Sequence, residues 1–138
     1  TKERDKKPLS WSARKPDIPT QWQCKIGLLA RGMVLCKDVL FVAGPPDLFG
    51  VATEKNSHPY TPAPKQSLRS QREALDGKSG TLLCAFSSAD GTKLSEYKFD
   101  GLPAWDGLIA ARGRLYMTMR DGTVTCFQGG RENGNSRQ

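Results

Sequence analysis

The sequence predicts an all-β protein made of small antiparallel sheets, and two observations carry the prediction. Over residues 80–129, short apolar or β-branched runs alternate with turns that contain Gly or Asp. The turns recur about every 8 to 12 residues, which is typical of all-β sandwiches, barrels and propellers. In addition, a twelve-residue pattern occurs twice in the chain without a gap.

The N-terminal part predicts an extended arm and then a hairpin. Residues 1–25 are basic and contain Pro, and we expect Trp11 and Trp22 to anchor this arm against a neighbouring surface. Residues 32–35 and 39–43 are apolar or β-branched around a turn-like break, which predicts a β-hairpin.

A long segment then separates this hairpin from the later strands. Residues 48–79 are rich in Pro and polar residues, and a structureless loop of this length is uncommon inside a compact domain. We therefore interpret residues 48–79 as an insertion between two strands, with one helical piece around residues 66–75. The polar residues 130–138 predict a flexible C-terminal tail.

The stretch at residues 80–129 is interpreted as one four-stranded antiparallel meander, or blade. Asp90-Gly91 and Asp121-Gly122 supply the Asp-Gly pairs that favour tight hairpins. The phase of Leu94 against Tyr97 predicts a bulge or a half-buried outer strand. Five strand-like runs are expected, one more than a four-stranded blade uses, at residues 81–86, 93–99, 105–111, 114–119 and 123–127.

An internal repeat favours a β-propeller over a sandwich or a barrel. Residues 32–43 (GMVLCKDVLFVA) align with residues 107–118 (GLIAARGRLYMT), and residues 80–84 (GTLLC) align with residues 122–126 (GTVTC). The unit is a hairpin, a Gly-Thr strand and an outer strand. Because such a sheet cannot bury both faces alone, we expect about two four-stranded blades of a partial β-propeller over residues 26–129.

Three segments carry a resemblance to a known family. Residues 85–94 (AFSSADGTKL), 113–116 (GRLY) and 121–127 (DGTVTCF) resemble the pyrroloquinoline-quinone-like β-propeller repeat, which quinoprotein alcohol dehydrogenases share with uncharacterised exported bacterial proteins. The resemblance covers residues 27–47 and 80–129. It implies a propeller blade and a periplasmic or secreted location.

The sequence departs from the repeat at three positions. Ser87 stands where the repeat has Asp, Asp90 stands where it has Thr, and Ser95 stands where the outer strand carries the Trp that docks blade on blade. Tyr97 is the candidate that fills part of that gap. The calcium ligands and catalytic Asp that the resemblance implies for quinoproteins map onto no residue here, so we predict no cofactor, catalytic residue or metal site.

The net charge of +7 and the pI near 9.4 raise nucleic acid or an anionic surface as partners. Residues 1–16 hold six Lys or Arg against two Asp or Glu, so more than half of the excess lies in one arm. Short arms of mixed charge are usually solvated ends, and Trp11 alone makes no stacking platform. No apolar run approaches the roughly 20 residues of a membrane span, and no signal peptide is recognised.

The cysteines and the histidine indicate no catalytic or metal site. Cys36, Cys84 and Cys126 lie in or beside apolar runs, so we expect small buried hydrophobic residues. With Cys24 they could also form two disulfides in an oxidising compartment. The single histidine, His58, has no second ligand near it and is interpreted as a loop residue.

Three functions are consistent with these residues. The first is a non-catalytic propeller segment that acts as a scaffold or binding surface, whose partners are further blades, other copies of the chain or another protein. The alternatives are a fragment of a pyrroloquinoline-quinone-dependent oxidoreductase that uses calcium, and a basic arm that binds nucleic acid or an anionic surface. Candidate surface residues are Tyr60, Arg69, Arg72 and Trp105; because Trp105 begins an apolar strand, we interpret it first as a core aromatic.

Overall fold

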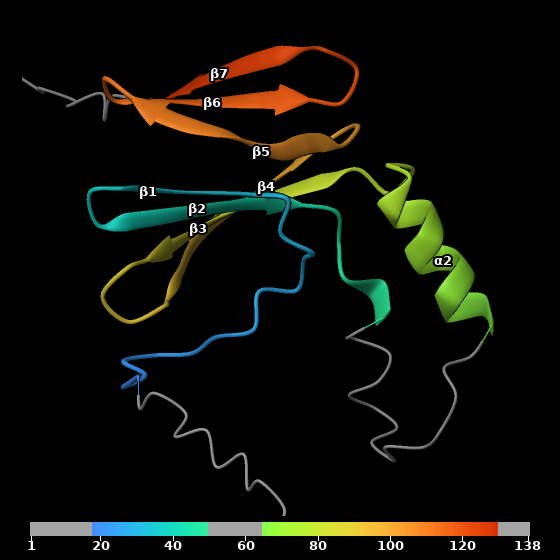
Figure 1. Cartoon of the computed structure of the whole chain (residues 1–138), viewed down its shortest axis with the longest axis horizontal. Helices are drawn as coiled ribbons and strands as arrows, with labels where there is room; N and C mark the ends of the chain where they lie inside the picture. Colours follow the sequence, from blue (N-terminus) through green and yellow to red (C-terminus); the bar gives the residue numbers. More distant parts are fainter. Residues whose placement is uncertain (1–17, 50–64, 130–138) are drawn as a thin grey trace, which may run out of the picture.

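The computed structural model describes residues 18–49 and 65–129, which form two stacked antiparallel sheets and one helix (Figure 1). The first sheet has the strand order β1-β2-β3-β4 and the second has the order β5-β6-β7. This confirms the predicted all-β character. The elements are β1 (Gly32–Cys36), β2 (Val39–Gly44), α2 (Lys65–Leu75), β3 (Thr81–Ser87), β4 (Lys93–Phe99), β5 (Pro103–Ala111), β6 (Arg114–Met119) and β7 (Val124–Gln128).

The helix in the predicted insertion is confirmed, and it docks beside the end of β2. Ala74 is fully buried, and the Gln71 side chain donates to the Pro46 carbonyl at 3.2 Å and accepts from the Phe49 amide at 2.9 Å. A buried glutamine amide needs such partners, because an unpaired polar group would cost desolvation energy. These bonds tie α2 to the segment that follows β2.

The division of residues 80–129 between two sheets corrects one expectation. These residues do not form one meander: β3 and β4 complete the first sheet with β1 and β2, while β5, β6 and β7 form the second. After β4, the chain turns through Gly101, whose carbonyl accepts from the Thr81 hydroxyl at 2.7 Å. Leu102 is buried and its carbonyl accepts from the Arg120 amide at 2.9 Å, so the turn leads into a new sheet.

β5 lies against β1, at the edge of the first sheet away from β4 (Figure 1). The Asp106 amide donates to the Arg31 carbonyl at 2.8 Å and links the two sheets there. A Cβ on Gly32 would lie 3.1 Å from Leu108 Cγ, so the absence of a side chain allows this close approach.

The main core lies between the two sheets. Ala43 and Leu83 of the first sheet pack with side chains of β5 and β6, while Val34, Phe41, Phe99 and others line its margin. Burial of these apolar surfaces is the principal force that holds the sheets together. The buried members from the second sheet are Leu108, Leu115, Met117 and Met119.

The segment that precedes β1 covers part of the other face of the first sheet, on which Met33 and Leu35 of β1 remain exposed. Leu28 packs there with Val42, Cys84 and Phe86. The predicted anchor role of Trp22 is confirmed, since its indole N–H donates to the Ser88 carbonyl at 2.8 Å. Trp11, His58, Tyr60 and the tail at residues 130–138 lie outside the described residues.

The internal repeat is visible in the strand pairing. Val34 pairs with Phe41 in the first hairpin, and their aligned counterparts Ile109 and Tyr116 pair in the second. The pairing of the third strand of the unit is shifted by one residue in the second sheet. In the first sheet Cys84 of β3 pairs with Val42. In the second sheet its counterpart Cys126 of β7 pairs with Tyr116 and not with Met117, the counterpart of Val42. A shift of one residue turns a strand's side chains to the opposite face.

Candidate binding groove

An apolar groove opens between the two sheets, with a volume of about 630 Å³. One side of the groove is formed mainly by β3 and β4 of the first sheet, and the other side mainly by the hairpin of β6 and β7. Its size falls within the range of small-molecule and side-chain pockets. The bulky side chains that line it are Phe41, Leu83, Tyr97, Phe99, Leu115 and Phe127.

The groove lies where the facing side chains of the two sheets do not fill the space between them. At its margin β4 and β7 still touch, since the ring centroids of Phe99 and Phe127 lie 5.0 Å apart. Ser95 of β4 lines the groove with a small side chain, and Tyr97 is 56% exposed. Tyr97 therefore borders the groove without filling it.

Along the edge of β7 beside the groove, no other strand within residues 18–49 and 65–129 pairs with the backbone. The Met119 amide donates to the Thr123 carbonyl at 2.8 Å, which makes Met119 and Thr123 a hydrogen-bonded pair. Such pairs alternate along an antiparallel ladder, so the amides and carbonyls of Thr125 and Phe127 also point to β6. Those of Val124, Cys126 and Gln128 point to the free edge of the described sheet.

Basic side chains gather at one end of the groove. Arg114 lines the groove itself, and Arg112 and Lys37 are exposed in the two hairpin turns beside it. Asp38, in the same turn as Lys37, is the acidic side chain in these two turns. This end of the groove therefore has a positive potential, which favours an anionic group on a bound molecule.

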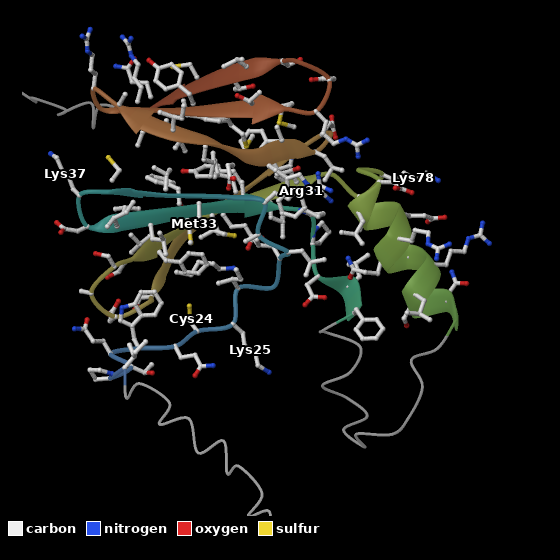
Figure 2. All side chains as sticks on the ribbon, viewed as in Figure 1. Cys24, Lys25, Arg31, Met33, Lys37 and Lys78 are labelled. Carbon is white, nitrogen blue, oxygen red and sulfur yellow. The ribbon has the colours of Figure 1, made fainter. Side chains whose placement is uncertain are left out.

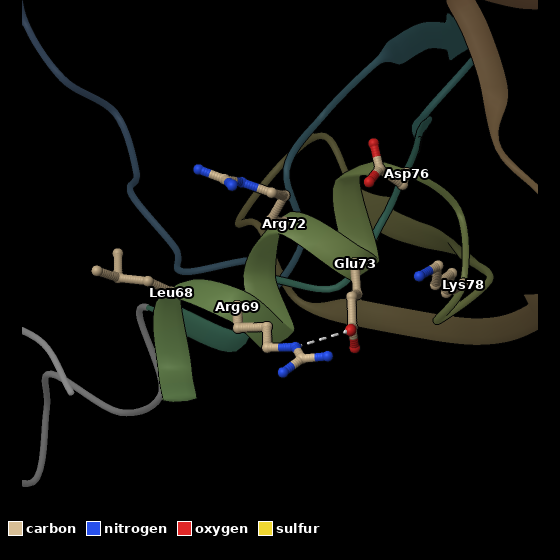
Figure 3. Close-up of a pocket in the computed structure, with 6 residues that line it drawn as sticks. All are labelled: Leu68, Arg69, Arg72, Glu73, Asp76 and Lys78. Atoms are coloured by element: carbon tan, nitrogen blue, oxygen red, sulfur yellow. Dashed lines mark hydrogen bonds and ion pairs between the residues drawn. The ribbon is translucent and has the colours of Figure 1, made fainter. Parts of the chain in front are cut away.

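Two of the predicted surface residues come together on α2. Arg69 and Arg72 are exposed and line a shallow surface pocket with Glu73, Asp76 and others (Figure 3). Arg69 Nε lies 3.4 Å from Glu73 Oε1, one helical turn away. An exposed ion pair of this kind contributes between about 0 and 1 kcal/mol, so this surface is charged but carries no buried binding group.

Trp105 lies apart from α2, and its interpretation as a core aromatic is wrong. Its side chain is 70% exposed, and the Arg31 guanidinium carbon lies 4.7 Å from the ring centroid. Arg31 also donates to the Pro103 carbonyl at 3.4 Å (Figure 2 labels Arg31 at the junction of the sheets). The cation–π contact thus holds Trp105 at the surface. The fourth predicted residue, Tyr60, lies outside the described residues.

The cysteines depart from the expectation in two cases. All four are free thiols; Cys84 is buried as predicted, but Cys36 is half-buried and Cys126 is exposed. The shift of β7 by one residue explains Cys126, because it turns this side chain away from the first sheet.

The surroundings of Cys84 keep its thiol protonated. Burial and, to a smaller extent, the neighbouring Glu96 carboxylate raise the pKa of Cys84, and its Sγ lies 3.7 Å from Glu96 Oε2. Lys93 donates to the same carboxylate oxygen at 2.6 Å, which lowers the pKa of Glu96. Because the thiolate is the nucleophilic form, Cys84 is a structural hydrophobic residue with a weak donor.

Neither a metal centre nor a membrane span is found in the described ranges. Within residues 18–49 and 65–129, no group of three or more His, Cys, Asp or Glu side chains could hold a metal ion. No helix in the same ranges is long and apolar enough to cross a membrane.

Comparison with protein-family models, with curated proteins and with solved structures returned no match for this chain.

The sequence contained one signal for the groove. By the resemblance drawn from the sequence, Ser95 stands where the propeller repeat has a bulky docking side chain, and in the structure Ser95 lines the groove. No sequence motif indicated that β7 would be an edge strand, because its place in the sheet depends on where the chain passes from the first sheet to the second.

Proposed function

We propose that the chain is a non-catalytic segment of a β-propeller, which serves as a scaffold or binding surface in a larger protein or assembly. Its partners would be further blades or other copies of the chain. By the resemblance of its repeat, such a segment would belong to an exported bacterial protein.

The observation that carries this proposal is the head-to-tail arrangement of the two sheets. Val34 and Phe41 of the first sheet face the second. Their repeat counterparts, Ile109 and Tyr116, lie on the outward face of the second sheet, where Ile109 is 62% exposed. By the repeat, the outward face of the second sheet therefore corresponds to the face that the first sheet turns toward the second sheet.

Such an arrangement supports the addition of further sheets. A contact between unlike faces generates a ring when the rotation closes, and propellers close with about four to eight blades. At the opposite end of the stack, Leu28 and its neighbours cover part of the outer face of the first sheet, while Met33 and Leu35 on the same face are 64% and 59% exposed and leave room for a contact with another copy. The outward face of the second sheet is the face that a further blade would cover.

The solution mass of two variants tests this proposal. The substitution Ile109→Lys places a charge on the outward face, and Leu68→Lys places the same charge on α2 at a site that is 52% exposed. We expect the wild type and Leu68→Lys to form a discrete oligomer and Ile109→Lys to dissociate, because burial of an unpaired charge is costly. A wild-type chain that stays monomeric and stable would refute the proposal.

A further inference from the structure

We propose that the groove between the sheets and the free edge of β7 bind an extended, acidic-ended segment of a partner protein, which adds to β7 as an antiparallel strand. The inference rests on the proposed function as a binding scaffold and names the class of its partner.

The backbone of β7 supplies the first part of the site. The amides and carbonyls of Val124, Cys126 and Gln128 point away from β6 at the edge of the described sheet. An unpaired strand edge is a template for another strand, and strand addition gains its affinity from main-chain hydrogen bonds.

The groove supplies the second part. A strand added to β7 would lie beside the exposed residues of β4 that line the groove, Leu94 and Tyr97, which are 55% and 56% exposed. Alternate side chains of a strand point to the same face, so every second residue of the partner would enter the groove. The apolar lining and the volume of about 630 Å³ fit bulky apolar side chains at these positions.

The charged side chains around the groove indicate what kind of segment binds there. Arg114, Arg112 and Lys37 lie at the end of the groove near Gln128, which favours acidic residues at the N-terminal end of an antiparallel partner strand. Residues 1–16 of this chain carry a net positive charge, so like charges disfavour that arm as the occupant. Residues 130–138 contain no apolar side chain that could fill the groove.

Fluorescence anisotropy of two labelled peptides tests the predicted chemistry. We expect the peptide EETVTFTV, labelled at its C-terminus, to bind the wild-type chain at least about tenfold more tightly than KKTVTFTV. The reason is that its two glutamates would pair with the basic side chains at the end of the groove near Gln128, whereas lysines would be repelled there. The variant Arg114→Glu should reverse that order. Equal binding of the two peptides, or no binding of either, would overturn the proposal.

The free edge is tested by a matched pair at one position. Cys126→Pro removes an amide that points away from β6 and leaves the β6–β7 bonds in place, since proline is tolerated at strand edges; Cys126→Ser keeps the amide. We expect the peptide to bind Cys126→Pro at least about tenfold more weakly than Cys126→Ser. Equal affinities for the two variants would show that the edge is not the binding element, provided that both unfold at the same urea concentration.

The groove is tested by Ser95→Trp against Ser95→Ala. The indole fills the space that the partner's side chains need, whereas alanine leaves it open, so only Ser95→Trp should weaken binding of EETVTFTV by about tenfold or more. Unchanged binding in Ser95→Trp would place the peptide elsewhere on the molecule and refute the inference.

Two other occupants have distinct results. If the arm at residues 1–16 fills the groove, Trp11→Ala in the full chain will tighten peptide binding, and this result would overturn the proposal. If two copies pair through β7, Cys126→Pro will lower the solution mass, and this would also overturn it. The proposed function fails by a different result, a monomeric wild type, so the failures of the two proposals are distinguishable.

Discussion

The substitution Gly44→Ala tests how the segment before β1 covers the first sheet. A Cβ on Gly44 would lie 1.9 Å from the Leu29 carbonyl oxygen and 2.8 Å from the Leu29 carbonyl carbon. Because both are backbone atoms, no side-chain rotation relieves the contact, and the two backbone segments must separate by about 1 Å.

The hydrogen bonds around Gly44 set the size of the effect. The Leu29 amide donates to the Pro45 carbonyl at 2.9 Å, and the Arg31 amide donates to the Ala43 carbonyl at 2.8 Å. Each such bond contributes about 0.5–1.5 kcal/mol, so the loss of both costs about 1–3 kcal/mol. The lower entropy of the unfolded alanine chain offsets about 0.4–1 kcal/mol of this, which leaves a net loss of about 1.3 kcal/mol at the middle of both ranges.

Urea unfolding followed by tryptophan fluorescence measures this loss. The control is Gly129→Ala, because a Cβ at Gly129 meets no atom within 4 Å. We expect the control to stay within about 0.5 kcal/mol of the wild type, as exposed substitutions usually do. If Gly44→Ala has the same free energy of unfolding as Gly129→Ala, residues 27–31 do not lie against the end of β2 and the described packing is wrong.

Three further predictions concern the core, the anchor and the charges. Met117→Ala should lower the free energy of unfolding by about 2–5 kcal/mol in urea denaturation, because Met117 is buried between the sheets; a loss below about 1 kcal/mol would contradict that packing. Trp22→Phe should cost about 0.5–1.5 kcal/mol by the same measurement through the lost bond to the Ser88 carbonyl, and an unchanged stability would exclude the anchor. Glu96→Gln should cost no more than about 1 kcal/mol near neutral pH, because its pair with Lys93 is partly exposed. Since the folded-state pKa of Glu96 is lowered, that cost should disappear as the pH falls through this pKa, and a cost that persists in acid would not come from the carboxylate.

Local sequence patterns predicted the strands well because their determinants are local. The alternation and Asp-Gly turns around residues 93–99 and 114–119 gave the observed bounds of β4 and β6. The division between the sheets does not follow from these local patterns, although the repeat unit of a hairpin, a Gly-Thr strand and an outer strand has the same strand sequence as the first sheet. It depends on Leu102, whose carbonyl pairs with Arg120, and on the contact of Asp106 with Arg31, and these contacts join residues far apart in the sequence.

The wrong interpretations of Trp105 and Cys126 share a cause. Both rest on the apolar run that contains or adjoins the residue, and such a run does not show which face of a sheet a side chain occupies. The pairing of β5 shifts between Pro103 and Leu108, and Asp106 has a φ of 55°, so Trp105 turns outward. In β7 the shift of one residue reverses Cys126. Irregularities of this kind follow from sheet packing rather than from the local residues. Arg69 and Arg72, which were expected at the surface as residues of the insertion, are exposed on α2.

The solution mass of the wild-type chain, measured by light scattering after gel filtration, tests the central claim most directly. That claim is that the outward face of the second sheet, on which Ile109 of β5 is 62% exposed, receives another sheet. We predict a discrete oligomer well above the monomer mass of 15.2 kDa, with a shift to the monomer in Ile109→Lys. A stable, monodisperse monomer for the wild type would contradict the claim.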